Sequence, residues 1–304
     1  PQPLADRVEL PVEPLDRVDW SVASEAASAG PLVGVSIESP WSQEQPTAPI
    51  RSGVGIEVPP GHILLSTSPA GLEGALRGRL PENRGRMAAA EGGTPASEAA
   101  VERGLSWLSK HQRRDGSWHF DHNLSDCQGQ CRNPGDHTST TAATAVALLP
   151  FLGAGYTHRY GDYKANVAAG LNYLKSRIRT TPHGADLREG TMYAQGLAAI
   201  ALCEAYGMTK DPGLKEAAQG AIDYIVWAQD QQGGGWRYAP GEVGDTTVTG
   251  WQVMALKSAQ MAYLRVPPQV YPKVTTFLNG VQAEAGARYG YMTPGKEPTT
   301  TAVG

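Results

Sequence analysis

From Thr94 onward, apolar residues recur at the spacing of one face of an α-helix. Thr94 and Pro95 form an N-cap followed by proline at the first helical position, and Val101, Leu105 and Leu108 then follow at intervals of four and three residues. This pattern predicts a helix that ends near Gln112. Similar amphipathic segments, here called outer helices, are expected at Tyr163–Arg179, Gly213–Gln231 and Tyr271–Glu284.

Between the outer helices lie segments rich in Ala, Thr and apolar residues with little charge. A helix that is apolar on nearly all sides is normally buried, so we call these the inner helices. Their alignment on Leu149, Leu202 and Leu256 gives spacings of 53 and 54 residues, a period typical of stacked helical hairpins. The expected inner helices are Thr138–Leu152, Thr191–Tyr206 and Thr246–Tyr263, with a fourth beginning at Thr299.

Two turns after outer helices share a glutamine, a glycine and a tryptophan. The first contains Gln112, Gly116 and Trp118, and the second contains Gln229, Gly233 and Trp236, with one extra residue before the tryptophan. Glycine allows the chain to reverse at a helix C-terminus. We expect the glutamine to bond exposed helix-end groups and the tryptophan to cover the gap between hairpins, a structural role that needs no chemistry.

These turns resemble the Gln-x-x-x-Gly-x-Trp turn of the squalene-cyclase and protein-prenyltransferase superfamily. A weaker trace lies at Gln282–Tyr289, and the hairpin through Pro182–Gly184 lacks the motif. The resemblance covers residues 94–304 and is closest to bacterial repeat proteins of that superfamily. It implies an all-α fold, an α/α toroid that is incomplete at its C-terminal end, with inner helices lining a central cavity.

Residues 1–93 differ in composition from the rest. Of the 23 prolines, 13 lie at or before Pro95, whereas all 12 tyrosines lie after it. Such a segment buries too little apolar area to offset its chain entropy, so a disordered or weakly structured linker is expected.

Cyclases of this superfamily protonate an alkene with an Asp-x-Asp-Asp motif, and no such motif occurs in the sequence. Asp245 is the nearest candidate acid, but a lone aspartate at a helix start is normally an ionised cap. It belongs to a set of four carboxylates that precede inner helices and that, if those helices point the same way, surround the cavity mouth: Asp136, Glu189, Asp245 and Glu297. Helix capping is one interpretation of this set, and binding of a cation or hydroxylated ligand is the other.

Ligand-type side chains are densest between the first turn and the first inner helix. Zinc would accept Cys127 and Cys131 together with two of His119, His122 and His137, although the spacing differs from that of the prenyltransferase ligands. The alternatives are a small loop disulfide, which would place the protein outside the cytoplasm, in the bacterial envelope, or two idle thiols. The third cysteine, Cys203, lies in an apolar run and is expected in the core.

The net charge of -4 and the pI near 6.0 provide no basic surface for nucleic acid. No apolar run is long enough to span a membrane. Because the first residue is Pro1 and the array ends inside a repeat, other domains of a longer protein are possible partners. The hypothesis is a binding or scaffold module with a cavity for an apolar or isoprenoid-like molecule. The alternative is an enzyme of cyclase, prenyltransferase or polysaccharide-lyase type whose catalytic residues lie partly beyond Gly304.

Overall fold

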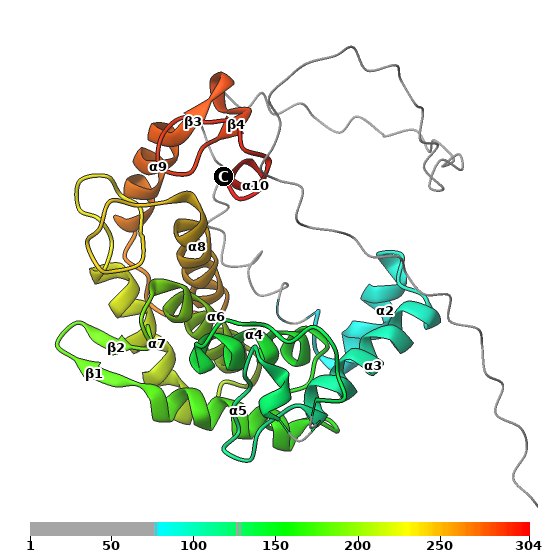
Figure 1. Ribbon diagram of the computed structural model, residues 1–304. Coiled ribbons are helices and arrows are strands. Elements are labelled where there is room, and N and C mark those ends of the chain that lie inside the picture. The colour runs from blue at the N-terminus through cyan, green and yellow to red at the C-terminus, as the bar shows by residue number, and fades with distance from the viewer. Residues whose placement is uncertain (1–75, 77, 126, 128) are drawn as a thin grey trace, which may run out of the picture. The chain divides into compact units, whose positions relative to one another are not determined.

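The computed structural model describes residue 76 and residues 78–125, 127 and 129–304, which lie within one compact unit spanning Leu64–Gly304. This part of the chain is mostly helical, and each helix expected after Thr94 is present within a few residues of its predicted ends (Figure 1). The helices are α2 (Pro81–Ala90), α3 (Pro95–Lys110), α4 (Thr140–Gly153), α5 (Lys164–Arg177), α6 (Met192–Thr209), α7 (Pro212–Trp227), α8 (Thr246–Met261), α9 (Val270–Val281) and α10 (Pro298–Thr301).

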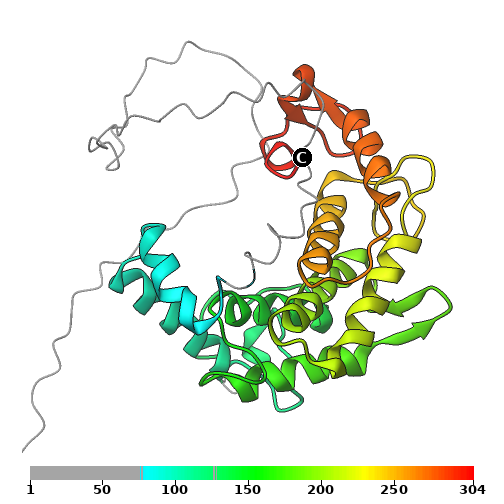
Figure 2. The same ribbon diagram turned by 180° about the vertical axis from the view of Figure 1, so that it is seen from behind.

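The helices α4, α6 and α8 pack side by side as one layer, and α5, α7 and α9 lie on their outer side (Figures 1 and 2). The central helix α6 is buried on nearly every face because its residues are small or apolar. Gly196 of α6 illustrates how close the neighbours come, since a Cβ at this position would lie 2.8 Å from the side-chain nitrogen of Gln252 in α8. The two classes of helix inferred from charge patterning therefore correspond to two layers.

Helix starts are fixed by short polar side chains. Thr94 and Ser97 form a reciprocal capping box at the start of α3, and the side chain of Ser139 accepts a hydrogen bond from the backbone N–H of Ala142 at the start of α4. Asp245 caps α8 in the same way, accepting from the backbone N–H of Val248 at 2.8 Å. These local bonds explain why the predicted starts of α3 and α8 agree with the structure.

The first turn motif links three elements. The amide nitrogen of Gln112 donates to the carbonyl of Gly116 and to the carbonyl of Asn166 in α5, both at 2.9 Å. Trp118 is 3% exposed, and its indole N–H donates to the carbonyl of Leu108 at 2.8 Å. The backbone N–H of Trp118 donates to the hydroxyl of Thr144 in α4. Through these bonds the turn contacts α3, α5 and α4.

The second turn repeats these bonds with one correction. Gln229 donates to the carbonyl of Gly234 at 2.8 Å, and Trp236 donates from its indole to Ile225 and from its backbone to Thr249. The glycine with positive φ is therefore Gly234, at +82°, as Gly116 is at +87°. The sequence alone aligns Gly233 with Gly116 and puts the extra residue between this glycine and the tryptophan. Hydrogen bonding shows that the insertion precedes Gly234.

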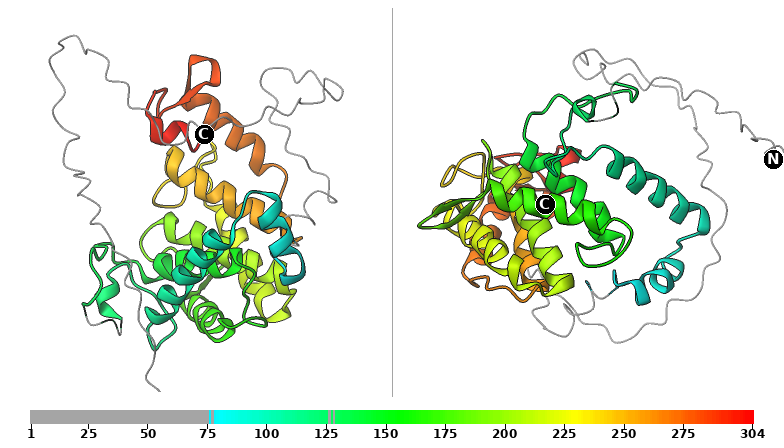
Figure 3. Two further views of the ribbon diagram at one scale, coloured as in Figure 1. Left: turned by 90° about the vertical axis from the view of Figure 1, so that its right-hand side faces the viewer. Right: turned by 90° about the horizontal axis from the view of Figure 1, so that it is seen from below.

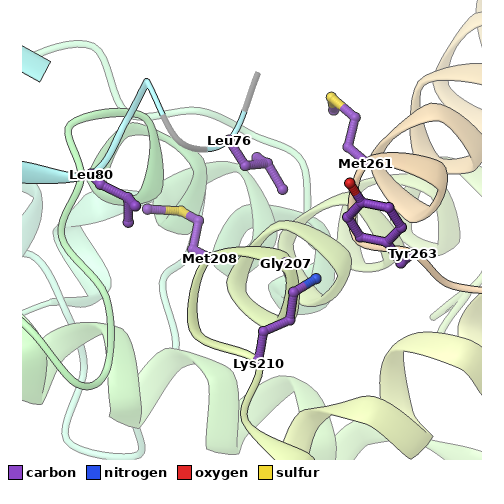
Figure 4. Close-up of a pocket in the computed structure, with 7 residues that line it drawn as sticks. All are labelled: Leu76, Leu80, Gly207, Met208, Lys210, Met261 and Tyr263. Atoms are coloured by element: carbon purple, nitrogen blue, oxygen red, sulfur yellow. The ribbon is translucent and has the colours of Figure 1, made fainter. Parts of the chain in front are cut away.

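The described part of the chain begins before Thr94. Helix α2 lies inside the segment assigned as weakly structured, whereas residues 1–75 lie outside the described residues. Leu76 packs against Gly207 at the end of α6, beside Met261 and Tyr263 from the end of α8 (Figure 4). Arg79 forms an ion pair with Glu204 of α6 at 2.5 Å. Long-range contacts of this kind leave no periodic signal in the local sequence.

Two short antiparallel hairpins accompany the helices. Strands β1 (Arg179–Thr181) and β2 (Gly184–Asp186) occupy the hairpin that lacks the turn motif, and β2 packs against α7 (Figure 3). Strands β3 (Gln282–Ala283) and β4 (Arg288–Tyr289) follow α9. Within the described residues, no helix has the length and apolar character needed to cross a membrane.

Candidate metal centre

The loop between the first turn and α4 brings two cysteines to the C-terminal end of α3. The chain leaves α3 at His111, passes through Trp118 and the short helix η1 (His122–Leu124), and then reaches Cys127 and Cys131. The imidazole nitrogen of His111 and the two sulfurs all lie within 4.8 Å of one another. Nε2 of His111 is 3.3 Å from Sγ of Cys131.

His111 is held in the orientation that a metal ligand requires. Its Nδ1 lies 2.6 Å from the backbone carbonyl of Trp107, one turn earlier in α3. Because a carbonyl oxygen only accepts, Nδ1 carries the proton, and in the neutral ring Nε2 keeps its lone pair toward Cys131. Trp107 also stacks on the imidazole, with ring centres 3.8 Å apart. Such a carbonyl bond is the usual support behind a metal-bound histidine.

The two thiols are free, as is that of Cys203, so the loop disulfide considered from the sequence is not present. Cys127 donates to the backbone carbonyl of His122 at 3.3 Å. Burial raises the pKa of the Cys127 thiol, but hydrogen bonds from Ser125 and from the backbone of Gly129 and Cys131 lower it below the usual value.

The structure separates the histidines proposed from the sequence. Nδ1 of His119 accepts from the backbone N–H of Asp121, and Nδ1 of His137 accepts from that of Ser139. Neither histidine belongs to the metal-compatible group. His122 lies beside this group: its ring meets that of His111 edge-on, with centres 5.8 Å apart. Its Nε2 is buried and has no hydrogen-bond partner among the described residues.

His111 was missed because it appeared to be part of an outer helix. Helical periodicity ends there, and Gln112 beside it begins the turn motif. The sequence feature that points to His111 is its place at the C-cap of α3, because a C-cap residue faces the loop that follows. Only the reversal of the chain after Trp118 brings Cys131 back to a residue 20 positions earlier.

An apolar pocket of about 210 Å³ adjoins the metal-compatible group. His111 and His122 contribute to one wall, and Trp107 and Val146 are the exposed large side chains at its edge. The complete lining is Trp107, Leu108, His111, Trp118, His119, Phe120, His122, Ala143, Val146, Ala147 and Pro150. This volume is below the range of about 300–1,000 Å³ that is typical of small-molecule sites.

The four carboxylates that precede inner helices differ in their environments. Asp136 and Glu297 are exposed, and the side chain that caps α4 is Ser139. Glu189 bonds the start of the preceding inner helix α4, where it accepts from the backbone N–H of Thr141 at 2.6 Å. Capping is thus the observed role of Glu189 and Asp245.

Asp245, the candidate acid, is fully buried. One carboxylate oxygen accepts from Val248 and from the hydroxyl of Thr247, and the other has no partner among the described residues. That hydroxyl also contacts the phenol oxygen of Tyr193 at 2.6 Å, which links the starts of α6 and α8.

Comparison with known proteins found no match among protein-family models, curated proteins or solved structures. The function of the site is therefore inferred from its own side chains and their geometry.

Proposed function

We propose that this chain is a binding or scaffold module of α/α-toroid type that holds one zinc ion at His111, Cys127 and Cys131. The mutual approach of these three donor atoms carries the proposal. In tetrahedral zinc sites, with Zn–S near 2.3 Å and Zn–N near 2.0 Å, neighbouring donor atoms stand about 3.4–3.8 Å apart. The 3.3 Å separation of His111 from Cys131 is close to that range.

The donor set favours zinc over harder cations. Two thiolates and an imidazole suit zinc, whereas magnesium and calcium select oxygen ligands. The ion would join the end of α3 to a loop of almost 20 residues whose described part contains one short helix, η1. Its chemistry would be to hold the loop in place, because metal binding adds directly to folding stability when the unfolded chain has no preformed site.

The α/α-toroid assignment rests on the two turns. Gln112 and Gln229, Gly116 and Gly234, and Trp118 and Trp236 make corresponding hydrogen bonds, and each tryptophan reaches a threonine of the following inner helix. These bonds support membership of the squalene-cyclase and prenyltransferase superfamily. The pocket beside His111 is small for an organic ligand, so we base the proposed function on metal binding and not on binding of an apolar molecule.

Metal analysis tests the proposal directly. We expect the 304-residue protein to bind one zinc per chain after removal of metal with a chelator and titration against a chromophoric competitor. Cys127→Ser and Cys131→Ser should each weaken zinc binding at least tenfold. Cys203→Ala is the matched control, because this thiol is buried in the core and should leave binding unchanged. Zinc binding that is absent, or equal in all three variants, contradicts the proposal.

A further inference from the structure

We infer that His122 is the fourth zinc ligand, so that the site is a closed Cys2His2 centre and not an open catalytic one. The inference rests on the proposed zinc site and assigns its remaining coordination position. A site with three protein ligands leaves one tetrahedral position for water or substrate, whereas four protein ligands give a structural site. The identity of the fourth ligand therefore decides what the metal can do.

The first observation is the unsatisfied nitrogen of His122. Nε2 is buried and has no hydrogen-bond partner among the described residues. Buried polar atoms are nearly always paired, and an orphan next to a set of metal ligands is explained by an ion that it would bind. Among the described residues, neither His119 nor His137 has a buried nitrogen without a partner, and Nδ1 of each accepts from a backbone N–H.

The second observation is the position of His122 between the other ligands. Its ring is perpendicular to that of His111, with centres 5.8 Å apart. Its backbone carbonyl lies 3.3 Å from the sulfur of Cys127, so the residue is next to the sulfur side of the centre. Coordination requires His122 to move inward, because its nitrogens lie outside the group of three whose donors are within 4.8 Å.

The local chain allows this movement. His122 begins the 3-10 helix η1, which is capped by the side chain of Asp121. The backbone of His122 is held, because its carbonyl accepts from the backbone N–H and the hydroxyl of Ser125, so the movement required is a rotation of the side chain. The ring of His122 meets that of Trp107 edge-on, with centres 5.5 Å apart, whereas His111 is fixed by the carbonyl of Trp107 and by ring stacking. We therefore assign His111 as the preorganised ligand and His122 as the ligand that closes over the ion.

The adjoining pocket makes a chemical rescue experiment possible. Both His119 and His122 line the 210 Å³ pocket, so a glycine at either position opens space for free imidazole. The probe is cobalt(II) in place of zinc, because its visible spectrum reports coordination number and thiolate ligation. The proteins to compare are the wild type, His122→Gly and the control His119→Gly.

We expect the wild-type cobalt spectrum to be tetrahedral and unchanged by imidazole. His122→Gly should bind cobalt at least tenfold more weakly and with an altered spectrum, and added imidazole should restore the wild-type spectrum. His119→Gly should match the wild type with and without imidazole. A wild-type spectrum that shifts on addition of imidazole would show an open position and overturn the inference, while leaving zinc binding intact.

An unchanged spectrum in His122→Gly would also overturn it. Failure of the wild type to bind cobalt or zinc would instead remove the proposed function itself. Cys127→Ser removes one of the two thiolates and leaves His122 in place, so its spectrum should lose part of the thiolate absorption whether or not His122 is a ligand.

Discussion

The carboxylate of Glu189 accepts a hydrogen bond from the backbone N–H of Thr141 at 2.6 Å, although 48 residues separate them. Glu189 immediately precedes the helical segment of α6, yet it caps α4, and it also accepts from the hydroxyls of Ser139 and Thr140. A negative charge at a helix N-terminus is stabilising, and bonds to a carboxylate are among the stronger ones. The carboxylate thus joins two successive inner helices.

Replacement of Glu189 should lower stability in a pH-dependent way. Burial raises the pKa of Glu189, but bonds from Thr141, Ser139 and Thr140 outweigh it and lower the pKa below 4.5. A depressed pKa contributes stability above the unfolded value, and this contribution is lost as pH falls through the folded value. We expect Glu189→Gln to cost about 1–2 kcal/mol near pH 7 and progressively less as the pH is lowered toward 3.

Urea unfolding at both pH values measures this effect. Glu216→Gln, at an exposed position of α7, is the control and should be neutral at either pH. A Glu189→Gln penalty that is as large in acid as at neutral pH would show that shape, and not charge, matters at this site.

The turn tryptophans should be major contributors to stability. Trp118 and Trp236 are 3% and 1% exposed, and truncation of such a residue to alanine typically costs about 3–5 kcal/mol. Phenylalanine at either position keeps most of the packing but loses the indole bond, for which we expect about 1 kcal/mol plus the effect of the smaller ring. Trp227→Ala, at a 42% exposed position, should cost much less in thermal unfolding. Equal melting temperatures for Trp236→Ala and the wild type would exclude the proposed role.

Alanine substitution should distinguish the two glycines of the second turn. Gly234 has a φ of +82°, and a Cβ there would collide with the backbone carbonyl of Lys273. A Cβ at Gly233 would meet only the carboxylate of Asp230, the far end of a side chain that can turn away. We expect Gly234→Ala to cost at least about 2 kcal/mol in denaturant unfolding and Gly233→Ala less than about 1 kcal/mol. A larger loss of stability for Gly233→Ala than for Gly234→Ala would show that Gly233 is the glycine the turn requires.

Leu76 should control the attachment of the segment before α3. Its side chain packs against Gly207, and neighbouring Arg79 pairs with Glu204, which is 7% exposed. We expect Leu76→Ala to speed tryptic cleavage after Arg84 and Arg86 severalfold, because local detachment exposes α2 without global unfolding. Mass spectrometry of timed digests locates the cuts. Met87→Ala, at an exposed position of α2, should leave the cleavage rate unchanged.

Much of the helical structure follows from local sequence. The outer helices have one apolar face and the inner helices almost no charge, so periodicity alone places both classes and their approximate ends. Capping by Thr94 and Asp245 and the Gln-Gly-Trp turn at Gln112 act within a few residues, which is why they could be predicted. The two cysteines of the loop are candidate ligands from the sequence alone, because ligand-type side chains are densest around them.

Tertiary structure decided which distant groups meet. The sequence contains His111, but only the fold of the loop brings Cys131 within 3.3 Å of it and leaves His119 and His137 with other partners. The docking of Leu76 and the capping of α4 by Glu189 depend in the same way on elements separated by tens of residues. Local propensity reports the conformation of a few neighbouring residues, whereas these contacts arise when whole helices pack and the chain reverses direction.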